Sequence, residues 1–362
     1  MAKVLHAADF HLDSAFRSLP EEQARLRRQE SRELPGRLVD WANDHGARLM
    51  LLAGDLFDSD RLYSQTAQML AQALSRFRGT VVIAPGNHDW LSAASPYRQP
   101  IWPENVRIFL GRGMERLTLP DLGCTVYGAA FTAPEEAESG LRGFYAQPDG
   151  SARIMVLHGD ATQAASPYNP ITPEQLAASG LAYLALGHIH QASGLLRCGS
   201  TCYAWPGCAM GRGFDELGQK GAYLGEVSDS GVRLDFLPLH GRSYEILRVE
   251  AGDDAFAAVT AALPEDTQND IYRVILTGEA EPVETAALQA ALAPRFYALT
   301  IRDETRPCRA LWEGAEEDTL RGLFLQALKA QYDAAQTEAD RRRIALAARC
   351  GCAAMDGREA AE

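Results

Sequence analysis

Short, almost wholly apolar runs alternate with longer amphipathic stretches over the first two thirds of the chain. These runs predict strands that are buried on both faces, at 4–7, 50–53, 80–84, 106–110, 125–128, 154–157 and 181–186. Helices are predicted between them at 21–44, with a kink or break at Pro35 and Gly36, and at 62–77. Two later runs, 221–227 and 232–237, predict a closing hairpin. The alternation is typical of an α/β domain, which we place at 1–240.

A second region follows with a different pattern. Strands are predicted at 244–250, 271–277 and 297–302 and helices at 254–263 and 283–292, which indicates a small α/β domain over 241–310. The remaining residues, 311–362, form a predicted helical tail. From about residue 316 the tail has an apolar stripe at helical spacing, made of Leu320, Leu323, Phe324, Ala327, Leu328 and Gln331.

Composition narrows the class of protein. Hydrophobic residues make up 46% and charged residues 23% of the 362 positions, which excludes a disordered or collagen-like chain. No apolar run reaches the roughly 18 residues of a membrane-spanning helix, and Lys3 interrupts the start too early for a signal peptide, so we expect a cytoplasmic protein without a membrane contact. The net charge of −13 does not by itself favour nucleic-acid binding. Arg25, Arg27 and Arg28 are interleaved with acidic residues, which favours an ordinary helix face over a phosphate contact.

Candidate metal ligands follow five of the predicted strands. The motifs are Asp9-Phe10-His11, Gly54-Asp55-Leu56-Phe57-Asp58, Gly86-Asn87-His88-Asp89, His158-Gly159 and Gly187-His188-Ile189-His190. Each motif alone is equally compatible with a turn or a buried core histidine. All five together, after strand ends where α/β sites form, predict a shared site. Carboxylate, amide and imidazole groups suit two borderline-hard divalent ions, and a carboxylate such as Asp55 can bridge two ions.

The order of these motifs resembles that of the calcineurin-like metallophosphoesterases. Within that superfamily the chain is most similar to the SbcD-like DNA-repair exonucleases, through the run from His6 to Ser14 and the segment from Trp205 through Glu216 to Gly221. The resemblance covers about 3–239. It implies a four-layer αββα sandwich, followed by a small α/β capping domain and a helical C-terminal tail.

The resemblance also implies roles for individual residues. One metal would be held by Asp9, His11 and His190, and the other by Asn87, His158 and His188, with Asp55 bridging them. His88 matches a catalytic histidine that assists the leaving group, and Asp58 matches an acid that orients it. The cofactors would be two divalent ions, manganese first, with iron, zinc or magnesium as alternatives. A metal-bridging hydroxide would attack phosphorus in line with the leaving oxygen.

Relatives in this branch act on DNA with an ATPase of the structural-maintenance (SMC) type, which grips a helical region after the nuclease core. The expected function is therefore a DNA exonuclease or endonuclease in double-strand-break repair. The expected partners are DNA, an SMC-type ATPase on the apolar stripe, and a second copy of the chain. The alternatives are a phosphodiesterase for small nucleotides, which the acidic charge favours, and a protein-interaction scaffold on the same fold. For the stripe itself, packing within its own domain is an equal alternative.

Overall fold

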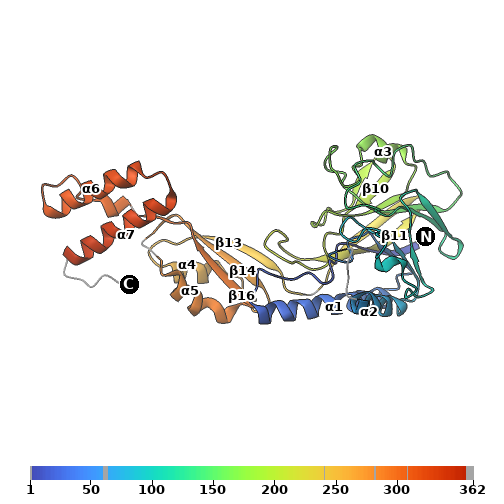
Figure 1. The fold of residues 1–362 in the computed structure, drawn as a ribbon, viewed down its shortest axis with the longest axis horizontal. Coiled ribbons are helices and arrows are strands. Elements are labelled where there is room, and N and C mark those ends of the chain that lie inside the picture. The colour runs from blue at the N-terminus through green and yellow to red at the C-terminus, as the bar shows by residue number, and fades with distance from the viewer. Residues whose placement is uncertain (1, 60–63, 240, 281–282, 308, 356–362) are drawn as a thin grey trace. The chain divides into compact units, whose positions relative to one another are not determined.

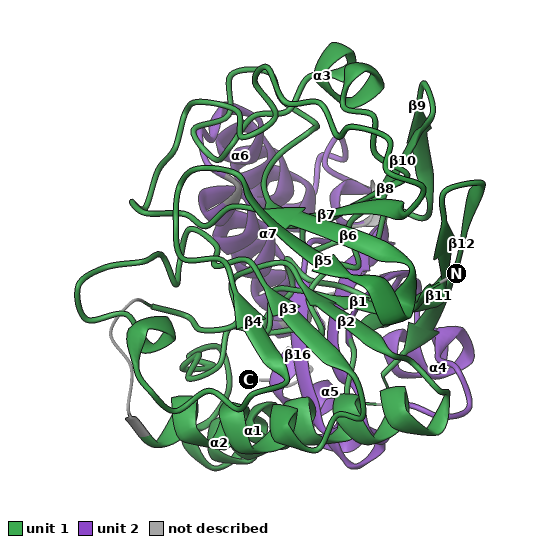
Figure 2. Cartoon of the chain, turned by 90° about the vertical axis from the view of Figure 1, so that its right-hand side faces the viewer, with its two compact units in different colours: residues 1–243 green, residues 244–362 purple. Residues whose placement is uncertain are grey.

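Strands from the first 238 residues form two six-stranded sheets in the computed structural model, which describes residues 2–59, 64–239, 241–280, 283–307 and 309–355 (Figure 1). The chain divides into two compact units, Met1–Ser243 and Tyr244–Glu362 (Figure 2). The first sheet has the order β12-β11-β1-β2-β3-β4. Its strands are β1 (Ala2–Ala7), β2 (Leu49–Leu52), β3 (Thr80–Ile83), β4 (Val106–Ile108), β11 (Gly221–Ser228) and β12 (Gly231–Pro238).

The second sheet has the order β5-β6-β7-β8-β10-β9. Its strands are β5 (Glu115–Leu119), β6 (Cys124–Gly128), β7 (Ala152–His158), β8 (Tyr183–Gly187), β9 (Leu196–Cys198) and β10 (Thr201–Ala204). The helices of this unit are α1 (Glu21–Asp44), α2 (Ser64–Ser75) and α3 (Pro173–Ala178), with short 3-10 turns at Pro96–Arg98 and Pro120–Leu122. The two sheets and their helices confirm the predicted four-layer αββα fold.

Apolar side chains fill the spaces between these layers. Val4, Leu51 and Val82 of the first sheet pack with Val126 and Ile154 of the second, and all five are fully buried. The opposite face of the first sheet packs against α1 and α2, which lie side by side in Figures 1 and 2. Because strands such as β2 are covered on both faces, they read in the sequence as unbroken apolar runs.

Helix α1 runs from Glu21 to Asp44 without the break expected at Pro35 and Gly36. A proline inside a helix costs about 3 kcal/mol. Leu34, Leu38 and Val39 are buried around it, and burial of such side chains stabilises the fold by roughly 1.5–3 kcal/mol each, which outweighs that cost. The break was therefore wrongly predicted, because the sequence shows the cost of the proline but not the packing that offsets it.

Two local predictions were also incomplete. Strands β5, β9 and β10 were not predicted, because β5 and β9 are half-exposed edge strands and β10 contains no Val, Ile or Leu, so their apolar signal is weak. Arg27 is not on a solvated face: its side chain is buried, and its Nη2 donates to the carbonyl oxygen of Gly211 at 2.7 Å. Among the described residues, no helix is long and apolar enough to cross a membrane.

His6 is a fully buried titratable group between the sheets. Its Nε2 lies 3.1 Å from the carbonyl oxygen of Leu186 and must donate to it, so Nδ1 accepts from the hydroxyl of Tyr183 at 2.7 Å. Burial lowers the pKa of His6 to about 3, below its ordinary value of about 6.5. The unfolded chain therefore binds a proton that the folded chain excludes, and the free energy of unfolding falls as the pH drops below 6.5.

We expect metal-free wild type to lose about 1 kcal/mol more unfolding free energy between pH 6 and pH 5 than a His6→Gln variant. Glutamine does not titrate but can donate to Leu186 and accept from Tyr183. Urea unfolding of both proteins in EDTA at the two pH values measures the difference. Equal losses in the two proteins would contradict the assignment.

The second unit contains a three-stranded parallel sheet of β13 (Tyr244–Glu250), β14 (Ile271–Thr277) and β16 (Ala298–Asp303), in the order β13-β14-β16. Helices α4 (Ala255–Ala262) and α5 (Thr285–Leu292) pack on it, and β15 (Glu279–Ala280) pairs with β17 (Arg306–Pro307). Short 3-10 turns lie at Ala293–Arg295 and Arg309–Trp312. The chain then forms a helical hairpin of α6 (Leu320–Ala334) and α7 (Glu338–Met355).

The predicted apolar stripe on α6 is divided by the structure. Phe324 and Leu328 pack with the buried Leu325 into a cluster that includes Ala348 of α7. Leu320 and Leu323 stay 76% and 56% exposed. The partner helix α7 thus covers one side of the stripe and leaves the other side open.

Candidate metal centre

The five predicted motifs meet at one rim of the first unit. β1, β2 and β3 run parallel in one sheet, and β7 and β8 run parallel in the other. Each motif begins at the carboxyl end of one of these strands or within four residues of it. Because the two sheets pack face to face, these loops converge.

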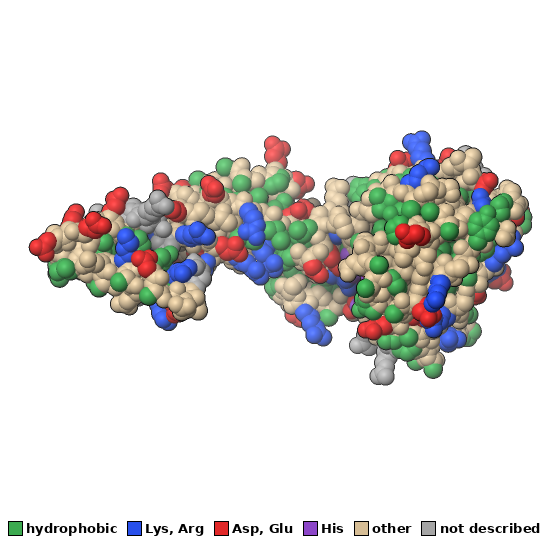
Figure 3. All heavy atoms as spheres, turned by 90° about the horizontal axis from the view of Figure 1, so that it is seen from above, with side chains coloured by type: hydrophobic (Ala, Val, Ile, Leu, Met, Phe, Trp, Pro, Cys, Tyr) green, Lys and Arg blue, Asp and Glu red, His purple; other side chains and the backbone are tan. Residues whose placement is uncertain are grey.

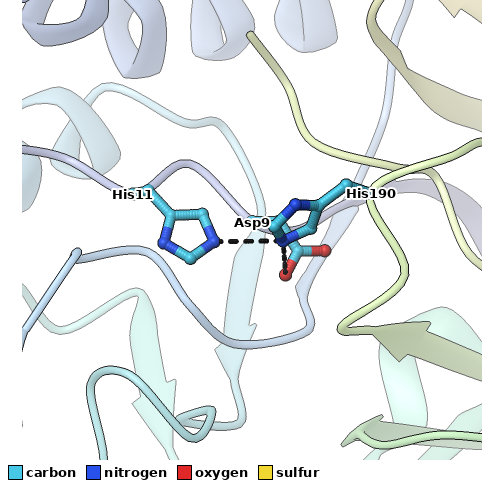
Figure 4. A group of neighbouring side chains, drawn as sticks. All are labelled: Asp9, His11 and His190. Atoms are coloured by element: carbon cyan, nitrogen blue, oxygen red, sulfur yellow. Dashed lines mark hydrogen bonds and ion pairs between the residues drawn. The ribbon is translucent and has the colours of Figure 1, made fainter. Parts of the chain in front are cut away.

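The first group of ligand atoms comes from Asp9, His11 and His190, which lie within 4.8 Å of one another (Figure 4). The Nε2 atoms of His11 and His190 are 3.3 Å apart, and Nε2 of His190 is 3.9 Å from Oδ1 of Asp9. Asp9 and His11 are fully buried, whereas the side chain of His190 is 29% exposed. These three nitrogen and oxygen atoms surround a point that a single cation can occupy.

The second group lies beside the first, around Asp55. The Nε2 atom of His158 is 2.9 Å from Oδ1 of Asn87 and 3.4 Å from Oδ2 of Asp55. The same Oδ2 is 3.7 Å from Nε2 of His11, so Asp55 lies between the two groups. The ring of His188 is 5.3 Å from that of His158, centre to centre. All seven predicted ligands are therefore brought together.

Several ligands have a strained backbone. Asp9, His11, Asp55 and His188 have φ angles of 54°, 45°, 50° and 103°, in the left-handed region that non-glycine residues rarely adopt. Hydrogen bonds hold these loops: the N–H of Asp9 donates to Gly54, that of His11 donates to Asp55, and that of His188 donates to the carboxylate of Asp9. Strain at a site persists only where its surroundings enforce it, as they do here.

Gly86 is required by its closeness to the carboxylate of Asp55. A Cβ atom at this position would collide with Oδ1 of Asp55. The backbone N–H of His88 donates to this same Oδ1 at 2.9 Å, which fixes the orientation of the carboxylate. The glycine in the Gly-Asn-His-Asp motif thus lets the third loop approach Asp55 closely.

Asp89 is a buried residue whose function was not predicted from the sequence. Its carboxylate accepts hydrogen bonds from the backbone N–H groups of Gly86, Asp55, Leu56 and Phe57 and from the hydroxyl of Tyr97. Burial, with the negative charge of Asp55, raises the pKa of Asp89 to about 6. The only signal in the sequence was an aspartate directly after the Gly-Asn-His run.

Asp58 contacts a different histidine from the one expected. Its Oδ1 atom lies 3.2 Å from Nδ1 of His11 and 3.2 Å from Nη1 of Arg212. His88 reaches Asp58 through the backbone carbonyl, at 3.5 Å from its own Nδ1. The reason is that the two loops pair, with the N–H of Asp58 donating to Leu12, which places the carboxylate beside His11. Ligand atoms of His11, Asp58 and His88 also lie within 4.8 Å of one another, so this trio is a further group able to hold a cation.

The electrostatics of the rim fit divalent cations. Burial, followed by the charge of Asp55, raises the pKa of Asp9 well above its ordinary value, and burial raises that of Asp55 as well. Burial also lowers the pKa of His158 and of His188 to about 4, so both imidazoles are neutral and able to ligate near pH 7. Two buried carboxylates among neutral imidazoles are costly without a counter-charge, which metal ions would supply.

Three comparisons relate this chain to known proteins. The family model described as calcineurin-like phosphoesterase matches residues 2–192. The uncharacterized metallophosphoesterase YhaO of Bacillus subtilis is 30% identical over 335 residues, which cover 83% of this chain and 81% of that protein. The crystal structure of TT1561 of Thermus thermophilus matches with a TM-score of 0.42 and 11% identity, over 66% of this chain and 99% of that one.

Proposed function

This chain belongs to the calcineurin-like phosphoesterases, and we propose that within them it is a two-metal phosphodiesterase that cleaves DNA. The observation that supports phosphodiester chemistry is the position of Asp55 between two groups of ligand atoms, with His88 exposed beside them. The choice of DNA follows the resemblance of the motifs to those of DNA-repair exonucleases. The family membership itself indicates a metal-dependent phosphoester hydrolase.

The ligands would hold two divalent ions, which when bound supply an activated water molecule and neutralise charge on the phosphate. Asp9, His11 and His190 form one ligand group and Asn87, His158 and His188 the other, with Asp55 shared. Manganese remains the first choice of ion, because the set combines hard carboxylate and amide oxygens with imidazole nitrogens.

The position of His88 supports a role as a proton donor. Its ring packs edge-to-face on His11 at 4.8 Å between centres, and the side chain is exposed at the rim where a substrate would enter. Its backbone N–H donates to Asp55, which fixes the position of the backbone that carries the imidazole. A protonated His88 can donate to the leaving oxygen or neutralise charge on it, which commonly contributes about 10²-fold or more.

The distribution of charged residues does not by itself indicate a DNA-binding face. Residues 1–243 carry 22 Lys and Arg against 26 Asp and Glu, a net charge of −4, and the remaining residues carry −9 of the total of −13. On the face drawn in Figure 3, basic and acidic side chains are interspersed. A basic partner subunit would therefore help this chain to bind DNA.

Manganese-loaded protein should degrade end-labelled single- or double-stranded DNA and also hydrolyse bis-p-nitrophenyl phosphate. A His88→Ala variant purified in parallel controls for contaminating nucleases. If the protein hydrolyses the small ester and short nucleotides but leaves DNA uncleaved, its substrates are small phosphodiesters and not DNA. Loaded protein that hydrolyses none of these would indicate a scaffold.

We further propose that the exposed side of α6 binds an SMC-type ATPase. Leu320 and Leu323 are large apolar side chains at helical spacing that stay exposed beside the packed Phe324. Such a narrow apolar stripe is suited to one helix or a coiled coil laid along it.

A Leu320→Asp/Leu323→Asp double variant is expected to lose co-purification with a co-expressed SMC-type ATPase of the same organism, while keeping wild-type hydrolysis of a short substrate. Both side chains are exposed, so the fold should survive, which circular dichroism checks. Phe256→Asp is the matched control, because Phe256 is 48% exposed on α4 and should not affect the complex. Retained ATPase binding by the double variant would exclude this surface, and light scattering of the free chain tests whether a second copy covers it instead.

A further inference from the structure

The segment from Gly207 to Lys220 connects two strands and grips one metal ligand, His190. The carbonyl oxygen of His190 accepts from the N–H of Cys208 and from Nζ of Lys220, both at 3.3 Å. Its ring Nδ1 lies 2.8 Å from Oε1 of Glu216. This segment therefore fixes both the backbone and the ring of His190, leaving Nε2 directed at the metal group.

Arg212 links these contacts at His190 to a second candidate ligand, His11. Its Nε and Nη2 contact the carboxylate of Glu216 at 2.6–3.3 Å, and its Nη1 contacts Oδ1 of Asp58 at 3.2 Å. That same Oδ1 is 3.2 Å from Nδ1 of His11. The guanidinium thus lies between the two carboxylates that orient His11 and His190.

These contacts form a closed cycle of side chains. It runs from His11 through Asp58, Arg212 and Glu216 to His190, and the two Nε2 atoms, 3.3 Å apart, close it at the metal group. We propose that Arg212 is a positioning residue that holds both imidazole ligands of one metal ion through Asp58 and Glu216. Without Arg212, the carboxylates of Asp58 and Glu216 would repel each other and would no longer hold the imidazoles of His11 and His190 in place.

The geometry favours positioning over a direct contact with substrate phosphate. The side chain of Arg212 is only 20% exposed, and its Nε, Nη1 and Nη2 atoms all contact Asp58 or Glu216. The neighbouring Gly211 is held by the buried Arg27 of α1 at 2.7 Å, so the backbone that carries Arg212 is anchored.

The second ligand group is oriented differently. Nδ1 of His158 lies 3.0 Å from the backbone carbonyl of Ala53, so a main-chain group rather than a carboxylate orients this ring. Loss of Arg212 should therefore weaken the ion at Asp9, His11 and His190 much more than the other ion. This proposal rests on the metal centre and is independent of DNA as the substrate.

The test measures manganese binding without substrate, by equilibrium dialysis and by electron paramagnetic resonance of bound Mn²⁺. We expect wild type to bind two ions with a spin-coupled signal. In Arg212→Gln one of the two ions should bind roughly 10- to 100-fold more weakly, and at submillimolar Mn²⁺ the signal should become that of an isolated ion. Arg212→Lys should give an intermediate loss, because an ammonium cannot make the same forked contact with both carboxylates.

Arg153→Gln is the matched control, since Arg153 is also an arginine of low exposure (15%) paired with a carboxylate, Asp229, away from the metal groups. It should bind both ions as wild type does. Wild-type affinities and a coupled signal in Arg212→Gln would overturn the proposal, and a raised KM with normal metal binding would assign Arg212 to the substrate instead. If Arg212→Gln does not fold, Arg212→Lys and Glu216→Gln decide in the same way.

Discussion

Replacing His88 by alanine is expected to leave two metal ions bound and to lower phosphodiester hydrolysis by about 10²-fold or more. The side chain is exposed at the rim, and the seven ligands that form the two groups do not include it. What is lost is a proton donor for the leaving oxygen. Metal analysis by mass spectrometry and the rate with bis-p-nitrophenyl phosphate measure the two effects separately.

Asp55→Asn is the comparison variant, because it should lose metal as well as activity. Its carboxylate lies between the two ligand groups, within 3.4 Å of His158 and 3.7 Å of His11. Because His11, Asp58 and His88 could together hold a cation, the metal content of His88→Ala also tests whether His88 is itself a ligand. If His88→Ala loses an ion, His88 is a ligand and its role as a proton donor is wrong.

Asp89→Ala is expected to lower the free energy of unfolding of the first unit by about 3–5 kcal/mol and to abolish binding of at least one metal ion. The carboxylate accepts from four backbone N–H groups and from Tyr97, and each buried donor left without a partner costs about 1–3 kcal/mol. Three of these donors belong to the loop of Asp55, so the variant should also release the carboxylate of Asp55 from its position between the two ligand groups. Urea unfolding in EDTA gives the stability, and dialysis against Mn²⁺ gives the binding.

Tyr97→Phe is the matched control for this prediction. It removes one donor to Asp89 and leaves the four backbone contacts, so it should cost about 1 kcal/mol and keep both ions. An Asp89→Ala protein with the unfolding midpoint and the metal content of Tyr97→Phe would show that the backbone donors find other partners. The anchoring role of Asp89 would then be rejected.

The candidate ligands could be located in the sequence because each one follows an apolar run. A strand buried on both faces, such as β2, must be apolar throughout, so the polar residues after it mark where the chain leaves the core. Asp9 and His11 are two residues apart in the chain, as are His188 and His190, so the closeness of each pair follows from the sequence alone. The parallel order of β1, β2 and β3 then places their loops at one rim.

Other features depended on atoms far apart in the chain. The continuity of α1 through Pro35 depends on burial against the first sheet, and the exposure of Leu320 depends on which side of α6 its partner helix covers. Asp58 was expected to orient His88; its carboxylate does lie near His88, but loop pairing gives its side-chain hydrogen bond to His11.

The sequence by itself located the strands and the polar motifs that follow them, because these depend on local hydrophobic period. Through the resemblance of those motifs to a known family it also implied the layer order and the seven candidate ligands, and the family is confirmed. Only the tertiary structure decided what orients the ligands. Arg212 is 154 residues from Asp58, and Glu216 is 26 residues from His190, and no periodicity or spacing links such pairs. The left-handed backbone of Asp9 and Asp55 is likewise held by contacts from other loops, since aspartate tolerates this conformation but adopts it only occasionally by itself.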